Sequence, residues 1–103
     1  MKKHEDISED DLAVLHLIQK NSNTSQRRLA KNTGFSLGKV NYCLKALIDV
    51  GFIKIQNFQN SKNKLKYTYI LTSKGIIEKT IITKKFIEKK QKEYDKLNSY
   101  IND

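Results

Sequence analysis

The spacing of apolar residues changes period twice along this chain, and that change restricts its fold more than any other feature. From Leu12 to Val50 apolar residues recur every three or four positions, which is the spacing of one helix face. From Phe52 to Leu71 β-branched and aromatic residues dominate, and the later ones alternate with polar residues as on a strand. The helical spacing returns after Thr72. A chain of 103 residues in this order is expected to form one mostly helical α+β domain.

Serines and glycines mark the ends of three predicted helices. Ser8, Ser25 and Ser36 each precede a helical segment and are favourable N-cap residues. Gly34 and Gly51 follow the second and third segments, where a left-handed residue can end a helix. The predicted helices therefore cover residues 9–20, Gln26 to Thr33, and about Leu37 to Val50.

A β-hairpin and one long helix are predicted after these three helices. The hairpin has strands over residues 52–58 and 65–71, joined by a polar turn that carries lysines. Thr72 is the expected N-cap of a final helix from Ser73 to about Ile101. Nearly thirty helical residues cannot all pack on so small a body, so the far part of this helix is expected to project.

Positive charge is concentrated in the middle of the chain. The whole chain has 20 lysines and arginines against 11 acids, a net charge of +9. Between Leu12 and Ile77 there are eleven bases and one acid, Asp49, so this segment of 66 residues carries +10. A merely solvated surface would mix both signs. The uneven distribution favours binding to a polyanion such as nucleic acid.

The order of helix, glycine turn, helix and hairpin is that of a winged helix-turn-helix. In this fold the third helix presents its outward face to the DNA major groove. There Asn41 could read adenine, and Lys39 or Lys45 could reach guanine or phosphate. Arg27 and Arg28 oppose the dipole of the second helix, so a phosphate is their natural partner. The alternative is an ordinary polar surface with a solvated hairpin tip. The predicted DNA-binding residues are Ser25, Gln26, Arg27, Arg28, Ser36, Leu37, Gly38, Lys39, Asn41, Tyr42, Lys45, Lys62, Asn63 and Lys64.

The final helix carries an apolar stripe with heptad spacing. The stripe consists of Ile87, Tyr94, Leu97 and Ile101, with Lys90 falling among them. A projecting apolar stripe needs a partner, so these four residues are predicted to form the seam of a homodimer. Lys90 would have to extend its ammonium outward into water. Part of the segment 76–82, at the start of the helix, is expected to pack on Leu12, Leu15 and Ile18 of the first helix instead.

The sequence offers little support for a catalytic or metal site. His4 lies in the N-terminal tail, and His16 is expected at the edge of the core. Cys43 is the single cysteine, which excludes an internal disulfide, and it is expected to be a buried and inert thiol rather than a redox sensor. No phosphate loop or metal-spaced cluster occurs, so neither an enzyme nor a cofactor is predicted. No apolar run is long enough to span a membrane and no secretory signal follows Met1, so a cytoplasmic location is expected.

Several strings in the sequence carry a resemblance to a known family. They are residues 36–47, 57–58, 60–64 and 71–76, and residues 86–87 and 90–94 extend the likeness. They resemble the small MarR-type winged-helix regulators associated with exopolysaccharide gene clusters. The resemblance implies a dimeric DNA-binding transcriptional regulator. The chain is shorter than full MarR proteins, so no small-molecule ligand is predicted.

The prediction is therefore a homodimeric regulator that binds an inverted-repeat operator in double-stranded DNA. Two alternatives stay open: an RNA-binding winged helix, and an adaptor whose basic face and final helix bind other proteins. The predicted divisions are a flexible tail over residues 1–7, a winged helix-turn-helix domain over 8–72 and a C-terminal dimerisation helix over 73–103.

Overall fold

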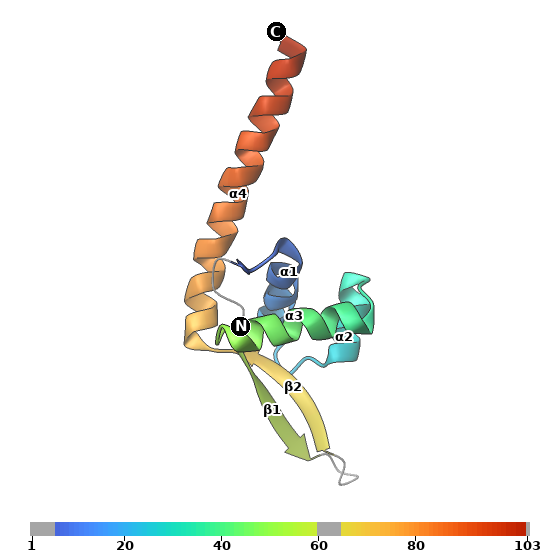
Figure 1. The fold of residues 1–103 in the computed structure, drawn as a ribbon. Coiled ribbons are helices and arrows are strands. Elements are labelled where there is room, and N and C mark those ends of the chain that lie inside the picture. The colour runs from blue at the N-terminus through green and yellow to red at the C-terminus, as the bar shows by residue number, and fades with distance from the viewer. Residues whose placement is uncertain (1–5, 60–64, 103) are drawn as a thin grey trace.

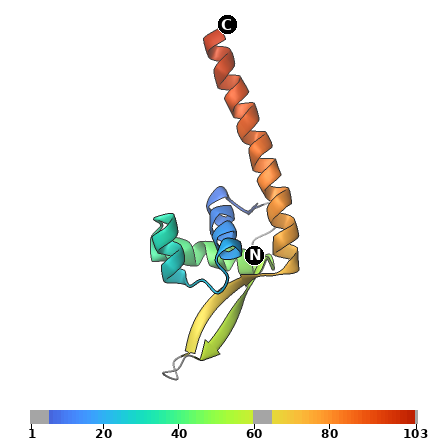
Figure 2. The same ribbon diagram turned by 180° about the vertical axis from the view of Figure 1, so that it is seen from behind.

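The computed structural model describes residues 6–59 and 65–102. Three helices form the body, a hairpin leaves it on one side, and a long helix projects on the other (Figure 1). The view from behind shows the same separation of hairpin and long helix (Figure 2). This is a winged-helix fold with a long C-terminal helix, as predicted. Its elements are α1 (Glu9–Lys20), α2 (Gln26–Thr33), α3 (Leu37–Asp49), β1 (Ile53–Gln59), β2 (Leu65–Leu71) and α4 (Ser73–Asn102).

The three predicted serine caps are confirmed. Ser8 and Asp11 form a capping box at the start of α1, in which each side chain accepts the other's backbone N–H at 3.0 Å. Ser25 and Ser36 each accept a bond from the third backbone N–H of their helix, at 3.2 and 3.1 Å. Gly34 ends α2 with a φ of 76°, which favours glycine. These caps explain why the element ends could be located from local sequence.

The core lies where α1, α3 and the base of the hairpin meet. Ile7 also belongs to it, with only 6% of its surface exposed. The prediction that the tail extends through residue 7 is therefore wrong at its last position, because an apolar residue just before an N-cap can cover the first turn of the helix. The fully buried apolar side chains of the core are Val14, Leu15, Ile18, Leu29, Val40, Leu44, Leu47 and Phe52.

The hairpin is anchored to the loop between α1 and α2. β1 and β2 pair antiparallel, from Ile53 opposite Leu71 at the base to Gln59 opposite Leu65. The Tyr69 N–H donates to the carbonyl oxygen of Thr24 at 3.1 Å, and this isolated bridge extends the sheet toward the loop. The bond fixes the hairpin relative to the start of α2.

The helix α4 is continuous over 30 residues, and its first turn packs directly on backbone. A Cβ atom added at Gly75 would overlap the carbonyl oxygen of Phe52. The Thr72 hydroxyl donates to the carbonyl oxygen of Gly51 at 2.6 Å and accepts the Gly75 N–H at 3.0 Å. The Thr72 N–H donates to the Phe52 carbonyl oxygen at 2.9 Å. Gly75 therefore permits a close approach of the two backbones.

Only one face of the α4 base contacts the body. Ile82 is buried and Phe86 is half-buried against the core, on the same side of the helix as Gly75. Ile76 and Ile77 are exposed. The expectation that part of residues 76–82 packs on the first helix is met by Ile82, whereas the side chains of Ile76 and Ile77 point away from the core.

We expect Gly75→Ala to destabilise the protein by about 1–3 kcal/mol, since its methyl group would force α4 away from Phe52. Gly38→Ala is the matched control, because a Cβ there meets only the Ser36 hydroxyl at 4.0 Å. The control is expected to be neutral or more stable by up to about 1 kcal/mol, from improved helix propensity. Urea unfolding of both variants at one protein concentration measures the difference. Equal stabilities would contradict the close-approach role of Gly75.

Candidate nucleic-acid interface

The helix α3 has one buried face and one exposed polar face. Its buried stripe includes Val40, Leu44 and Leu47, which pack on α1 and the hairpin base. The predicted contact residues on the opposite face all lie at the surface, and Tyr42 is 65% exposed. A single straight helix face of this kind fits the DNA major groove, which is about 12 Å wide. The exposed residues are Ser36, Leu37, Gly38, Lys39, Asn41, Tyr42 and Lys45.

The turn between α2 and α3 is fixed by a side chain that was predicted to bind DNA. The Gln26 amide nitrogen donates to the carbonyl oxygen of Leu37 at 3.0 Å, linking the first turns of the two helices. Phe35, inside the turn, is half-buried against the core. The Ser25 and Ser36 hydroxyls accept backbone N–H groups as caps. The structure thus gives Gln26, Ser25 and Ser36 internal bonds that hold the angle at which α3 is presented.

A polar groove runs between the start of α2 and strand β2. Arg27 and Arg28 are exposed on the helix side, and Tyr67 is 55% exposed on the strand side. Guanidinium groups beside a phenol hydroxyl offer donors that suit a phosphate group. The groove is lined by Asn23, Ser25, Gln26, Arg27, Arg28, Tyr67, Thr68 and Tyr69.

Tyr67 and Asn23 were not predicted as site residues. The alternation in β2 places Tyr67 and Tyr69 on one face of the strand, and this signal was available in the sequence. That this face lies opposite the arginines of α2 follows from the bond between Tyr69 and Thr24, which no local pattern specifies.

Lys39 on α3 is paired with an acid from another helix. Its ammonium nitrogen lies 2.9 Å from an Asp10 carboxylate oxygen and 4.2 Å from the centre of the Phe35 ring. The exposed face of α3 therefore has an acidic neighbour, although the helix itself carries no acid before Asp49. Asp10 belongs to the acidic start of the chain, but packing of α1 on α3 brings it to this surface.

The last group of predicted contact residues is at the hairpin tip. Lys62, Asn63 and Lys64 lie outside the described residues. Their contact with DNA stays a prediction. Strands β1 and β2, which lead to this tip, extend away from the body on the side opposite to the projecting end of α4 (Figure 1).

Cys43 is buried in α3, with 2% of its surface exposed. Burial, and secondarily the neighbouring Asp11 carboxylate, raises the pKa of its thiol to about 12. The thiol is therefore protonated at neutral pH, which supports the expectation of an inert group. In the ranges 6–59 and 65–102, no cluster of three or more histidines, cysteines and acids is arranged to hold a metal ion.

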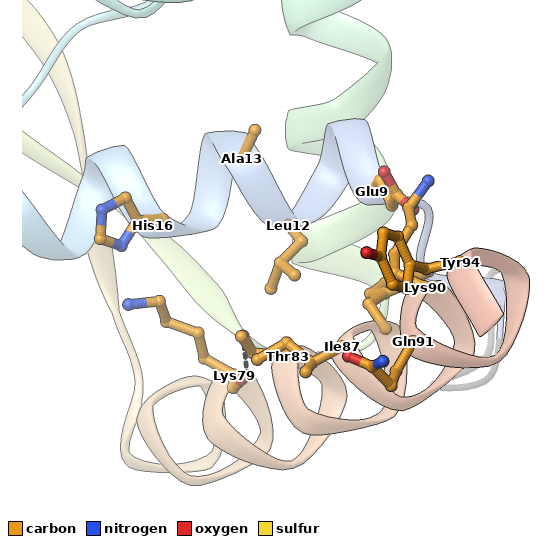
Figure 3. Close-up of a pocket in the computed structure, with 11 residues that line it drawn as sticks. Glu9, Leu12, Ala13, His16, Lys79, Thr83, Ile87, Lys90, Gln91 and Tyr94 are labelled. Carbon is orange, nitrogen blue, oxygen red and sulfur yellow. Dashed lines mark hydrogen bonds and ion pairs between the residues drawn. The ribbon is translucent and has the colours of Figure 1, made fainter. Parts of the chain in front are cut away.

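A second groove separates α1 from α4 and is mainly apolar (Figure 3). Leu12 of α1 faces Thr83 and Ile87 of α4 in its middle. At one end the Lys90 ammonium pairs with Glu9 at 3.0 Å, beside Tyr94. At the other end lie Lys79 and His16.

His16 lies at the surface of α1 rather than at a core edge, in contrast to the expectation. Partial burial, followed by the charges of Lys79 and Lys20, lowers the pKa of the His16 imidazole. The surroundings therefore favour the neutral form of His16 at this end of the groove.

The predicted dimer stripe begins in this groove and continues beyond the body. Ile87 and Tyr94 line the groove, while Leu97 and Ile101 lie farther along α4. These four side chains are 62–83% exposed. Lys90 lies on the same stripe, and its ammonium is paired with Glu9 of α1. None of the helices among the described residues is both long and apolar enough to cross a membrane.

Residues 8–54 match the family described as winged helix-turn-helix DNA-binding. Solved structures with a similar fold include Staphylococcus aureus MarR in complex with salicylate and kanamycin, with a TM-score of 0.63 and 22% identity over 84% of this chain and 56% of that one. Streptococcus pneumoniae FabT in complex with DNA has a TM-score of 0.62 and 21% identity over 88% of this chain and 62% of that one. MepR, a regulator of the S. aureus efflux pump MepA, has a TM-score of 0.63 and 19% identity over 89% and 67%.

These similarities establish a shared winged-helix fold. The chain spans less than two thirds of the length of the first two proteins, at 56% and 62%. No curated protein matches the sequence at a significant level.

We expect the Cys43 thiol to react very slowly with a thiol-specific disulfide reagent at pH 8 in the folded protein. A pKa of about 12 lowers the thiolate fraction roughly a thousandfold from that of an ordinary cysteine, and burial blocks access as well. The chain unfolded in urea should react promptly and release one equivalent, because Cys43 is its single cysteine. Fast stoichiometric reaction of the folded protein would contradict the assignment of an inert thiol.

Proposed function

We propose that this protein is a homodimeric, sequence-specific DNA-binding regulator of transcription. The observation that carries the proposal is the exposed polar face of α3, which lies within the segment matching winged helix-turn-helix DNA-binding domains. The buried stripe of the same helix fixes which side faces outward. The fold is shared with FabT, which has been solved in complex with DNA.

In the proposed complex α3 is the recognition helix and enters the major groove. Asn41 is placed to bond adenine through its amide, and Lys45 to reach guanine or a phosphate. Arg27 and Arg28, in the groove beside Tyr67, bind the phosphate backbone and set the position of the protein on the duplex. The wing residues Lys62 and Lys64 are proposed to add sequence-independent contacts to the backbone or the minor groove.

The proposed dimer forms through the apolar stripe of α4. Each stripe side chain contributes roughly 1.5–3 kcal/mol when fully removed from water. Ile87 and Tyr94 belong both to the stripe and to the groove between α1 and α4, so a second α4 packed on the stripe would also cover this groove. A two-fold dimer would place two recognition helices about 34 Å apart, on successive turns of one DNA face. The proposed operator is therefore an inverted repeat.

The genes that this protein regulates are proposed from the resemblance of its sequence to a known family. The likeness of residues 36–47 and 71–76 to exopolysaccharide-associated regulators makes surface-polysaccharide genes the first candidates. A genome-wide binding map, followed by binding measurements on the sites found, would supply the operator. Preference for structured RNA over every such duplex would favour the RNA-binding alternative.

Substitutions in α3 and α2 are expected to differ in kind. Asn41→Ala should weaken binding to the best duplex by roughly 1–3 kcal/mol and leave random duplex binding nearly unchanged, because it removes a base contact. Arg27→Ala combined with Arg28→Ala should weaken all duplexes about equally and reduce the salt dependence. Fluorescence anisotropy with both duplexes over a salt series measures these effects.

Lys85→Ala is the control for these variants, because it removes an exposed lysine from α4 rather than from α2 or α3. It should change duplex affinity little. Suppose that Asn41→Ala weakened binding to all sequences equally while the double arginine variant changed sequence preference. Base recognition would then be assigned to α2 rather than to α3. Binding of the unmodified protein that does not respond to salt would contradict the electrostatic basis of the proposal.

We expect Leu97→Asp combined with Ile101→Asp to give a monomer that keeps its helical content and loses tight operator binding. Two charges would have to be buried in the proposed seam, which is strongly unfavourable. Lys89→Asp combined with Lys96→Asp places two acids on another face of α4 and should leave the dimer intact. Sedimentation equilibrium measures the mass of all three proteins. If the unmodified protein is a monomer at tens of micromolar, the proposal that the α4 stripe forms a dimer interface is wrong.

A further inference from the structure

We propose that Asp10 is a built-in counterion of the recognition helix, which holds the Lys39 ammonium and lowers the affinity of the protein for DNA of arbitrary sequence. The inference rests on the proposed function, because it assigns a role in DNA binding to a residue outside α2, α3 and the hairpin. It concerns the ratio between specific and non-specific binding.

The pair lies at the surface where DNA is proposed to bind. The Lys39 ammonium nitrogen is 2.9 Å from the Asp10 carboxylate, and the two side chains are 46% and 49% exposed. The Lys39 ammonium also lies over the ring of Phe35, 4.2 Å from its centre. A cation held by both partners is positioned before any DNA arrives, and it is still open to exchange.

Asp10 is held in place by the structure of the first turn of α1. The capping box between Ser8 and Asp11 flanks it on both sides, with two bonds of 3.0 Å. The Asp11 side chain is almost completely buried, which fixes that turn against the body. A phosphate that approaches Lys39 therefore also meets the Asp10 carboxylate, since the backbone that carries it is anchored.

The energetic consequence falls on binding rather than on folding. An exposed ion pair contributes little to stability. A carboxylate within the Debye length of about 8 Å from a phosphate, however, repels it at physiological salt. A lysine whose charge is already balanced by Asp10 does not neutralise a DNA phosphate. It therefore releases no cation from the DNA and does not contribute to sequence-independent affinity.

The same pair favours one sequence over others. On a duplex that offers Lys39 a well-placed guanine edge, the ammonium can leave Asp10 for the acceptors O6 and N7. On other duplexes the pair stays closed, and the acid disfavours close approach. Asp10 thus acts against wrong sequences, which is a recognised way to gain specificity.

Glu9 provides a matched control for Asp10. It is the neighbouring acid in the same first turn, and its side chain is 51% exposed. Its partner is Lys90 of α4, at 3.0 Å, rather than a residue of α3. Neutralising either acid removes one negative charge and weakens the favourable interaction with the helix dipole by a similar amount. A difference between the two variants therefore reports the position of the charge.

The test compares Asp10→Asn with Glu9→Gln on a random-sequence duplex and on heparin, over a salt series. Asp10→Asn is expected to bind the random duplex about 3- to 10-fold more tightly, with a log–log salt slope steeper by about one unit per protomer. Glu9→Gln should differ from the unmodified protein by less than about twofold. Adding Lys39→Met to Asp10→Asn should abolish the gain. Circular dichroism verifies that each variant is folded.

The outcomes separate this inference from the proposed function. Equal affinities and slopes for the two single variants on both ligands would overturn the counterion role, even if the unmodified protein binds DNA well. If Asp10→Asn elutes from heparin at higher salt than Glu9→Gln but no variant binds duplex DNA, Asp10 weakens binding to polyanions in general, and both its role in DNA specificity and the proposed function are wrong. A gain in Asp10→Asn that persists after Lys39→Met would also overturn the inference, because the pair would not be its cause.

Discussion

The close contact between the backbones of Gly75 and Phe52 sets the geometry on which the rest of this structure depends. Gly75 can approach only because it has no Cβ atom, and Thr72 bonds the same segment through the Gly51 carbonyl. This contact joins the end of α3, the base of the hairpin and the start of α4 within a few residues. The direction in which α4 leaves the body is therefore fixed by backbone packing (Figure 1). In the proposed dimer, that direction would set the separation of the two recognition helices.

The start of α1 is a second point on which several elements converge. Three consecutive acids there have three different partners. Glu9 pairs with Lys90 of α4, Asp10 pairs with Lys39 of α3, and Asp11 caps its own helix beside the buried Cys43. The two exposed pairs add little to stability, whereas Asp11 belongs to the core and to the cap. One turn of helix thus places charge on both sides of the body, toward the groove and toward the proposed DNA surface.

The proposed DNA surface has two parts with different structural support. The groove of Arg27, Arg28 and Tyr67, the proposed phosphate-binding part, is held by a main-chain bond between β2 and the loop before α2. The face of α3 is held by its buried stripe and by the bond from Gln26 to Leu37. Backbone contacts can therefore position the duplex while α3 is presented at one angle, which is the division of tasks that winged helices use.

The sequence by itself located the ends of the helices and strands to within one residue, and it determined which side of α3 faces outward. Serine caps, left-handed glycines and apolar spacing act within one element, so neighbouring residues are enough to define them. Local spacing could not place Asp10 beside Lys39, Tyr67 opposite Arg27 or Ile7 in the core. These contacts depend on how whole elements pack, and only the tertiary structure decided them, because the packing of α1 on α3 and the bond between β2 and the loop before α2 bring together residues far apart in the chain.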